Sequence, residues 1–474
     1  MLLGRRAGYF SVFLLFMGGC TTMSMNAGFT EVSTLVEERN ATKLFWNNGT
    51  DLDKEAAEKL RSLLKEKLTV DGAVQIALLN NRELQAVYSD LGVAQADLVQ
   101  AGLLKNPIFE AEILFPLAHG GRPDLELSAV MSFLDVFYMP LRKRVAAARF
   151  EAAKLRVSGA VLDLAAQVRR TYYVHQSNEQ MVELRKTILE ALGISFDVAR
   201  RLHEAGNMSD LDFFRQRALL ETVKLELASA ELAVLQSREQ LTTLMGLWGQ
   251  DTNWELEGRM PEIPKEPISV TGIETVALQK SLELNIAWQR IMAAGEELGF
   301  SKWNAFLPEL HGGPRGVHQE RSWTEVGPVI EFPLPLFDQG QGQVGRTASQ
   351  LRRAQQEYYA LALRIRSAAR TVRDRMQATR DRALFVRDIM LPLRERVLNE
   401  LQLQYNAMQF GVFQLLRARE QQIETAVSYI ESLRDYWLAR TDLSQILMGR
   451  LPAGNGVPAG QNGSQPKMEE PQGH

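Results

Sequence analysis

The sequence predicts a mainly α-helical fold with a small β part, built from one structural unit that is written twice. Three features of the 474 residues support this prediction. Blocks of residues recur in the same order at a nearly constant distance. Two stretches of about 60 residues have the pattern of very long helices, and four short segments alternate apolar and polar side chains. Together these features indicate duplicated long helical hairpins, each preceded by a pair of strands.

The first block of the repeat lies near residue 70. Leu68–Leu78 (LTVDGAVQIAL) returns as Ile268–Leu278 (ISVTGIETVAL), 200 positions later. Glu83-Leu84 returns as Glu283-Leu284 at the same distance. Similarity at a fixed distance along one chain indicates repeated structural units.

The later blocks keep the same order. Ala205–Arg217 matches Ala407–Arg419 at a distance of 202, and Met245-Gly246 ends the first half as Met448-Gly449 ends the second. The predicted organisation is a first repeat over 68–250, a proline-containing linker over 251–267, a second repeat over 268–451 and a tail over 452–474. The tail is rich in Gly, Pro, Gln and Ser and is expected to be disordered.

Both repeats are predicted to contain a helix, two strands, a long helix and a second helix after a break. Pro107 ends the first helix because the residue before a proline avoids helical geometry. The predicted helices cover 71–104, 141–203 and 210–245 in the first repeat, and 272–305, 341–408 and 412–447 in the second. The predicted strands cover 107–115, 126–136, 308–318 and 324–337.

The long helices predict an extended architecture. A helix of about 60 residues rises about 90 Å, far more than a globular domain needs. Apolar residues recur every seven positions, which is typical of helices that pack as coiled coils. The predicted seam comprises Leu220, Leu227, Val234 and Leu241 with Val223, Ala230, Ser237 and Leu244 in the first repeat, and Leu416, Ile423, Ile430, Trp437 and Ser444 in the second.

The predicted strands alternate in polarity. On one face lie Phe109, Ala111, Ile113 and Phe115 of the first strand, Leu127, Ala129, Met131 and Phe133 of the second, and Val326, Ile330, Phe332 and Leu334 of the last. Alternation over about ten residues is typical of outer-membrane barrels, although a soluble sheet shows the same pattern. Four strands leave open edges, which lipid does not tolerate. A membrane role therefore requires this chain to pool its strands with those of other copies.

The first twenty residues predict export. Two arginines precede an apolar stretch, Tyr9–Met17, which is followed by two glycines and the only cysteine, Cys20. Such a start is typical of a signal peptide, and a cysteine at this place resembles a bacterial lipobox. We expect a signal peptide over 1–19 and a lipid-anchored segment with one helix over 20–67. The alternative is a spare thiol in a signal peptide that is simply discarded. No later apolar run is long enough to predict a transmembrane helix.

Composition argues against catalysis and nucleic-acid binding. The formal net charge is −3, whereas phosphate binding needs a basic face. No glycine motif that cradles phosphate follows a strand. The six histidines lack the spacing of metal ligands: His119, His175, His203, His311, His318 and His474. We therefore expect no enzyme activity, no cofactor, no metal site and no nucleic-acid partner.

The order of elements, written twice behind a lipobox-like start, resembles that of the TolC-type outer-membrane efflux factors. Two segments within about residues 68–450 carry the likeness: Phe332–Gly342 (FPLPLFDQGQG), at the elbow from strand to long helix, and Gly206–Ser209 with Leu211 at the tip of the first hairpin. The resemblance implies a homotrimer in the outer membrane. Its twelve pooled strands would form a transmembrane β-barrel, and its hairpins an α-barrel that reaches into the periplasm.

The resemblance also implies a function. Such a trimer would be the passive exit duct of a tripartite efflux or type I secretion-like pump. Its partners would be a periplasmic adaptor, an inner-membrane transporter and the outer-membrane lipid. The helix within 20–67 would then be equatorial to the tube.

The hairpin tips are where the resemblance places the functional residues. Family members usually have glycine where Met408 stands, and acidic residues where Gln414 and Arg417 stand. Our hypothesis is a periplasmic aperture lined by Asp212, Arg215, Gln414 and Arg417. The residues expected to contact the adaptor are Gly206, Ser209, Met408 and Gly411. The alternative is that all of these are solvated positions or ordinary interhelix pairs.

Two other classes of protein share some of these features. A lipid-anchored periplasmic adaptor also has a lipobox, but it has one hairpin at mid-chain between glycine-rich β domains. A secreted coiled-coil scaffold would not need alternating strands. The cargo stays open among metal ions, drugs, solvents and a peptide.

Overall fold

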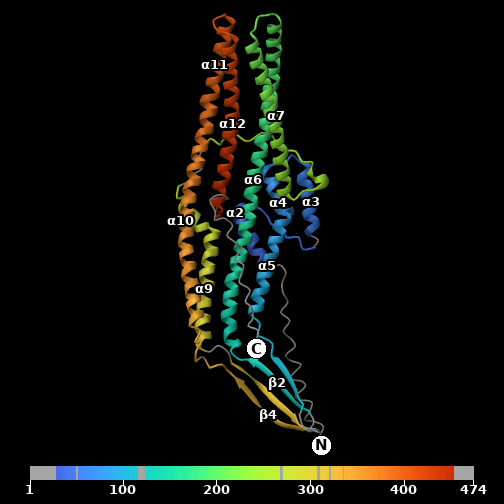
Figure 1. The fold of residues 1–474 in the computed structure, drawn as a ribbon, viewed down its shortest axis with the longest axis vertical. Helices are drawn as coiled ribbons and strands as arrows, with labels where there is room; N and C mark the ends of the chain where they lie inside the picture. Colours follow the sequence, from blue (N-terminus) through green and yellow to red (C-terminus); the bar gives the residue numbers. More distant parts are fainter. Residues whose placement is uncertain are drawn as a thin grey trace. The chain divides into compact units, whose positions relative to one another are not determined.

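The computed structural model describes residues 28–49, 52–115, 123–266, 271–306, 310–319, 322–334 and 336–452. The predicted signal peptide, Cys20 and the predicted tail from residue 453 lie outside these ranges. The described chain forms two compact units, whose elements are labelled in Figure 1. Among the described residues, the first unit contains those within 28–30, 89–154 and 289–352, and the second contains the others.

The structure confirms the mainly α-helical class and the duplicated order of elements. The helices are α2 (Phe29–Asn40), α3 (Leu52–Lys65), α4 (Val70–Asn80), α5 (Arg82–Ala101), α6 (Asp135–Glu204), α7 (Asp210–Met245), α8 (Ile273–Lys280), α9 (Leu282–Phe306), α10 (Gln341–Phe385), α11 (Leu391–Asn406) and α12 (Val412–Leu447). The strands are β1 (Ile108–Leu114), β2 (Asp124–Ser132), β3 (His311–Gln319) and β4 (Ser322–Glu331), and two short turns are η1 (Gly249–Thr252) and η2 (Val386–Met390). None of the helices in the described ranges is both long and apolar enough to cross a membrane.

The first helix of each repeat is broken, which the sequence did not predict. The stretch predicted as one helix over 71–104 is α4 and α5, which meet at Asn81, and the stretch over 272–305 is α8 and α9, which meet at Ser281. The Asn81 Oδ1 accepts a hydrogen bond from the Leu84 N–H at 2.8 Å, and the Ser281 Oγ accepts one from the Leu284 N–H at 3.0 Å. A side-chain oxygen that binds the N–H three residues on is an N-cap, which starts a new helix.

The helix predicted over 341–408 is also interrupted. A π-turn, η2, separates α10 from α11, and Pro392 stands at the start of α11. A proline has no N–H to donate to the carbonyl four residues back, so the regular hydrogen-bond ladder cannot pass through it. The wider turn just before Pro392 absorbs this interruption. The segment over 20–67 likewise contains two described helices, α2 and α3, where one was expected.

The predicted seam residues of α12 are buried or half-buried, as are those of α7. In α12 the buried line is Ala418, Thr425, Ser432 and Ala439, which matches Gln216, Val223, Ala230 and Ser237 of α7 at a distance of 202. The predicted line through Ile423 and Trp437 packs on the first hairpin, where Trp437 stacks on Tyr173 of α6 with ring centroids 5.0 Å apart. Apolar residues cover two faces of α12, and periodicity alone does not tell which face packs inside the hairpin.

The strands form one antiparallel sheet in the order β1-β2-β3-β4 within the first unit. Register places Phe109 beside Ala129 and Glu112 beside Glu126, so the predicted alternation is confirmed. The strands end at Ser132 and Glu331, and the predicted face residues Phe133, Phe332 and Leu334 follow them in the connections to helices. The apolar face is exposed in the chain: Val326 is 75% and Ile330 68% exposed. The opposite face carries six acidic residues: Glu110, Glu112, Asp124, Glu126, Glu325 and Glu331.

The repeated Met-Gly pair has a structural explanation in the second unit. Gly246 ends α7 with φ +67°, and Gly449 follows α12 with φ +90°. The place of a Cβ on Gly246 lies 2.7 Å from the Asn80 carbonyl oxygen, and that on Gly449 lies against the Lys280 carbonyl. Each repeat therefore seats its last helix against the C-terminal end of its first short helix, and only glycine fits there.

Replacing Gly246 by alanine should lower the free energy of unfolding by about 3 kcal/mol. The left-handed backbone costs an L residue about 1–2 kcal/mol, and the clash with the Asn80 carbonyl adds to it. The control is Gly258→Ala, because Gly258 has φ +58° but open space around the new Cβ. Urea unfolding of both variants measures the difference. Equal losses would show that backbone strain alone acts at Gly246.

Candidate functional site

The tip of the first hairpin joins α6 to α7 through a short turn in the second unit. Gly206 has φ +74°. The Asn207 N–H donates to the Leu202 carbonyl at 2.8 Å and the Gly206 N–H to the His203 carbonyl at 2.9 Å, which is a Schellman end. Ser209 then caps α7, its Oγ accepting from the Asp212 N–H at 3.2 Å. At the predicted break, Gly206 thus ends α6 and Ser209 is the N-cap of α7.

The tip of the second hairpin has the same backbone but different side chains. Met408, at a distance of 202 from Gly206, has φ +58° and repeats the Schellman end, with the Gln409 N–H donating to the Gln404 carbonyl at 2.9 Å. Its side chain is 94% exposed. Gly411 stands where Ser209 stands in the first repeat and caps α12 without a side chain. A methionine in the left-handed region costs about 1–2 kcal/mol relative to glycine.

The four predicted aperture residues lie in the first turns of α7 and α12. Asp212 is tied to its neighbours: its carboxylate accepts from the Ser209 Oγ at 2.6 Å and lies 3.5 Å from the Arg215 guanidinium. Gln414 and Arg417 are exposed, and Arg417 forms no ion pair with a described residue. The structure therefore joins Asp212 to Arg215, and it joins neither of them to Gln414 or Arg417.

Sequence reasoning missed a clasp that closes the first tip. The His203 Nε2 lies 2.7 Å from the Asp210 Oδ1, and the His203 ring stacks on Phe213 with centroids 4.5 Å apart. Phe196, seven residues before His203 on α6, also stacks on Phe213, with ring centroids 5.6 Å apart. The spacing of His203 and Phe213 on either side of the Gly206 turn is the signal that could have indicated this contact.

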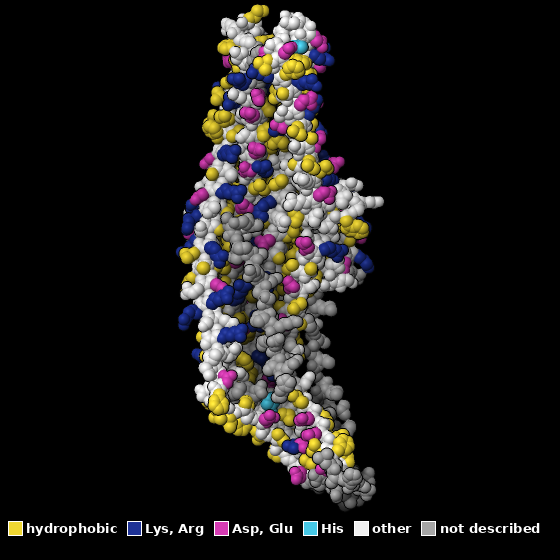
Figure 2. Space-filling view, viewed as in Figure 1, with side chains coloured by type: hydrophobic (Ala, Val, Ile, Leu, Met, Phe, Trp, Pro, Cys, Tyr) yellow, Lys and Arg dark blue, Asp and Glu magenta, His cyan; other side chains and the backbone are white. Residues whose placement is uncertain are grey.

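Helix α7 has a second apolar stripe, which no part of the described chain covers. We call it the outer stripe of α7; its members are exposed by 55–70% and are Leu211, Phe214, Leu225, Leu232 and Leu235. Yellow side chains along the hairpins in Figure 2 show how much apolar surface the helices leave open. The end of α10, η2 and α11 have a similar exposed line, formed by Phe385, Ile389, Leu393 and Val397. Contiguous exposed apolar surface of this kind marks an interaction site.

The duplication relates these two stripes to a contact inside the chain. Within the second unit, α12 of the second repeat contacts α6 of the first through Trp437 on Tyr173 and through Ile423, which packs on the cluster around Ile188 and Leu220. The α7 counterpart of Trp437, at a distance of 202, is Leu235, which is 61% exposed. The counterpart of α6 is the chain of helices α10 and α11. Within the described ranges, the α12–α6 contact is present, and its counterpart between α7 and the α10–α11 helices is not made.

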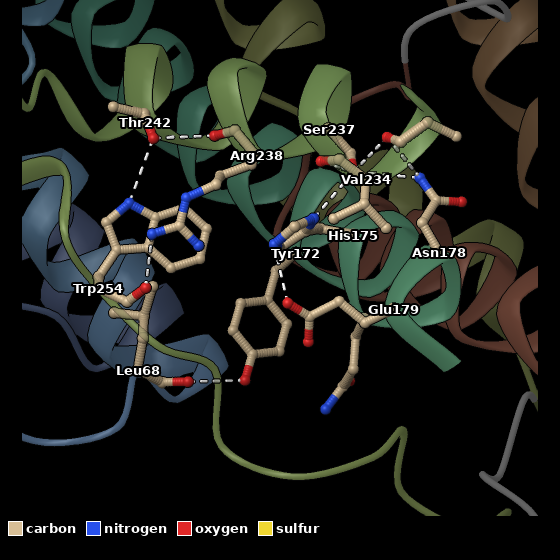
Figure 3. A network of polar contacts seen from close by, with 12 residues as sticks. Leu68, Tyr172, His175, Asn178, Glu179, Val234, Ser237, Arg238, Thr242 and Trp254 are labelled. Carbon is tan, nitrogen blue, oxygen red and sulfur yellow. Dashed lines mark hydrogen bonds and ion pairs between the residues drawn. The ribbon is translucent and has the colours of Figure 1, made fainter. Parts of the chain in front are cut away.

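Figure 3 shows a buried polar cluster between α6, α7 and the segment that follows α7. The His175 side chain is fully buried; its Nδ1 lies 2.9 Å from the Ser237 Oγ and its Nε2 lies 3.5 Å from Glu179 Oε1. Trp254 meets the His175 ring edge-on with centroids 5.4 Å apart, and the Arg238 guanidinium lies 4.1 Å from the centre of the Trp254 ring. The cluster fixes the start of the linker against both helices of the first hairpin.

The order Ser237, His175, Glu179 resembles a catalytic triad, but its environment indicates a structural role. A nucleophile needs a free lone pair and access to substrate. Ser237 is buried, and its Oγ donates to the Ala233 carbonyl at 2.8 Å while accepting from Asn178 at 3.1 Å. Burial, assisted by Arg238, lowers the pKa of His175 to about 4. No group of three or more potential metal ligands occurs within the described ranges either.

The pKa of His175 predicts how stability depends on pH. The unfolded histidine has a pKa of about 6.5, so between pH 6.5 and 4 the unfolded chain binds more protons than the folded chain. The free energy of unfolding should therefore fall as the pH drops through this window, by about 2 kcal/mol from His175 at pH 5. Burial raises the pKa of Glu179, which acts in the opposite direction.

The matched variant His175→Gln separates these two effects because it leaves Glu179 in place. Unfolding free energies at pH 7 and pH 5 should differ less for this variant than for the unaltered chain. An equal loss in both proteins would show that His175 does not titrate in this window.

Comparison with known proteins finds similarity to outer membrane efflux proteins. Residues 140–247 match the model of the outer membrane efflux protein family. The cobalt-zinc-cadmium resistance protein CzcC of Cupriavidus metallidurans is 23% identical over 402 residues, which cover 80% of this chain and 90% of that protein. The probable efflux pump outer membrane protein TtgC of Pseudomonas putida is 22% identical over 253 residues, half of each protein.

Solved structures share the fold. The CmeC outer membrane channel of Campylobacter jejuni superposes with a TM-score of 0.65 at 16% identity and covers 88% of this chain and 92% of its own. The outer-membrane channel OprN gives a TM-score of 0.67 at 16% identity, covering 85% and 94%. With the duplicated hairpins and the four-stranded sheet, these findings all indicate an outer membrane efflux protein of the TolC type.

Proposed function

We propose that this chain is the exit duct of a tripartite efflux pump, a passive trimeric channel that carries small molecules or ions from the periplasm to the exterior. The observation that carries the proposal is the sheet. One face is apolar and exposed, the other is acidic, and β1 and β4 have no further partner among the described strands. Three copies would supply twelve strands with a lipid-facing and a water-facing side.

The exposed helix stripes support the same trimer. We infer that the outer stripe of α7 packs on the Phe385–Val397 line of the next copy, repeating between chains the contact that α12 makes with α6 inside the chain. Two different surfaces then meet at each interface. Such head-to-tail contacts close into a ring when the rotation fits.

Charge placed on the outer stripe should break the trimer. Leu232→Lys puts an ammonium group into the proposed interface, whereas Gln240→Lys puts the same group on an exposed part of α7, about 80° around the helix. We expect detergent-extracted Gln240→Lys to have three times the chain mass and discrete single-channel steps in a planar bilayer. Leu232→Lys should lose both.

A conducting trimer of Leu232→Lys would contradict the assigned interface. A chain that is monomeric and never conducts in its unaltered form would contradict the duct itself. That outcome would favour the alternative of a lipid-anchored adaptor or coiled-coil scaffold, which the two hairpins and the sheet do not support at present.

We propose that the aperture of the duct is lined by Asp212, Arg215, Gln414 and Arg417. Its support is the position of all four in the first turns after the two tips, and the exposure of Gln414 and Arg417. An aperture with two arginines and one aspartate would not select cations by charge. Arg417→Asp should raise the potassium-to-chloride permeability ratio by about two-fold or more. An unchanged reversal potential in a salt gradient would end this proposal.

The remaining parts of the proposal concern the surroundings of the duct. Cys20 would be lipidated and anchor the chain in the outer membrane, with the pooled strands supplying further membrane contact. A periplasmic adaptor would bind the tips at Gly206, Ser209, Met408 and Gly411, and an inner-membrane transporter would supply the energy. The relatives are named for resistance to cobalt, zinc and cadmium and for an efflux pump. The duct itself would perform no reaction.

A further inference from the structure

Helix α10 is unusually rich in arginine. Its 45 residues include ten arginines, no lysine and three acidic residues, in a chain with a net charge of −3. Dark blue side chains follow this helix in Figure 2. In the second unit Arg353, Arg364, Arg375 and Arg382 are 11, 11 and 7 residues apart, close to three, three and two turns of a helix. These four arginines, the arginine line, therefore lie along one side of α10.

The side that carries the arginine line is exposed. The exposed residues between the arginines on this side are small: Ala360, Ser367, Thr371 and Ala378. Arg353 pairs with Glu357 at 2.8 Å on the same helix, and Arg375 lies 3.6 Å from Asp442. Arg364 and Arg382 form no hydrogen bond or ion pair with any residue that the structure describes. Large exposed apolar residues such as Tyr359 and Leu363 lie elsewhere around α10.

The linker between the repeats marks the opposite side of the helix. Two residues along an α-helix turn about 200°, so Arg380 lies nearly opposite Arg382. The Arg380 guanidinium donates to the carbonyls of Pro264 at 3.5 Å and Lys265 at 3.1 Å, and the Trp437 Nε1 donates to the Pro261 carbonyl at 2.9 Å. The linker is thus fastened across this side of α10 and α12. A segment fastened across the inner side would obstruct a passage, so the linker side is the outer one.

We propose that the arginine line faces the passage and guides anionic cargo. This inference rests on the proposed trimeric duct, in which three copies would place twelve guanidinium groups along the wall. Guanidinium groups bind carboxylate and phosphate oxygens in pairs, and they stay charged at every physiological pH. A wall that carries them raises the local concentration of anions. The cargo class is therefore carboxylates, phosphates or negatively charged complexes.

The matched pair Arg364→Gln and Arg366→Gln tests this inference. Both arginines are exposed and lie two residues apart, Arg364 in the line and Arg366 on the linker side. The measurement is the chloride-to-potassium permeability ratio of the trimer, from the reversal potential in a potassium chloride gradient. Arg364→Gln should lower the ratio by about two-fold or more at low salt, and Arg366→Gln should leave it unchanged. The acidic face of the sheet also contributes to the ion selectivity of the pore. The test is therefore the difference in permeability ratio between the two variants, and not the ratio of either one alone.

Equal changes in the two variants, or no change in a conducting Arg364→Gln trimer, would overturn the inference and leave the duct standing. A protein that never conducts in any form would overturn the duct, and the inference with it. Added citrate, a trivalent carboxylate, should change the conductance of the unaltered trimer but not that of Arg364→Gln. This difference would support the assigned cargo class.

Discussion

Apolar surface that the chain cannot bury by itself is the constraint on which this structure depends. It occurs in both units: one face of the sheet is exposed over β1 and β4, and α7 and α11 have exposed apolar stripes. Exposed patches of this extent are unfavourable in water, and they mark surfaces that are covered in the assembled protein. In the proposed duct, further copies of the chain and the surrounding bilayer would cover this surface.

Because the structural unit is duplicated, the same helix face packs within the chain in one repeat and is exposed at its surface in the other. The α12 face that packs on α6 within the chain corresponds to the α7 face that is exposed. The glycine seats at Gly246 and Gly449 hold the two repeats in the same internal geometry. Side chains differ between the two repeats at the tips, where Gly206 and Ser209 of the first repeat correspond to Met408 and Gly411 of the second. The different side chains of the two tips and the many arginines of α10 are differences between the repeats that the fold does not require.

Several local features were within reach of sequence reasoning and were still missed. Asn81 and Ser281 are good N-cap residues at equivalent positions, yet the apolar periodicity continues past both and suggested one helix. Pro392 signals an interruption, but only the structure shows that a π-turn absorbs it. The His203–Phe213 contact crosses the Gly206 turn, and the His175 cluster joins residues of different helices; helical periodicity has no information about which residues of two helices pair.

By itself the sequence determined the class of fold, the two repeats, the alternation of the strands and the positions of the tips. These follow from local chemistry: side-chain period, turn residues and similarity at a fixed distance depend only on neighbours along the chain. The tertiary structure alone decided which of the two apolar faces of α12 packs inside its hairpin, and which residues remain exposed for another copy. It also decided that the linker is fastened to Arg380 and so distinguishes the two sides of α10. Those facts depend on the angle at which one helix meets another, and that angle is set by contacts between residues more than a hundred positions apart.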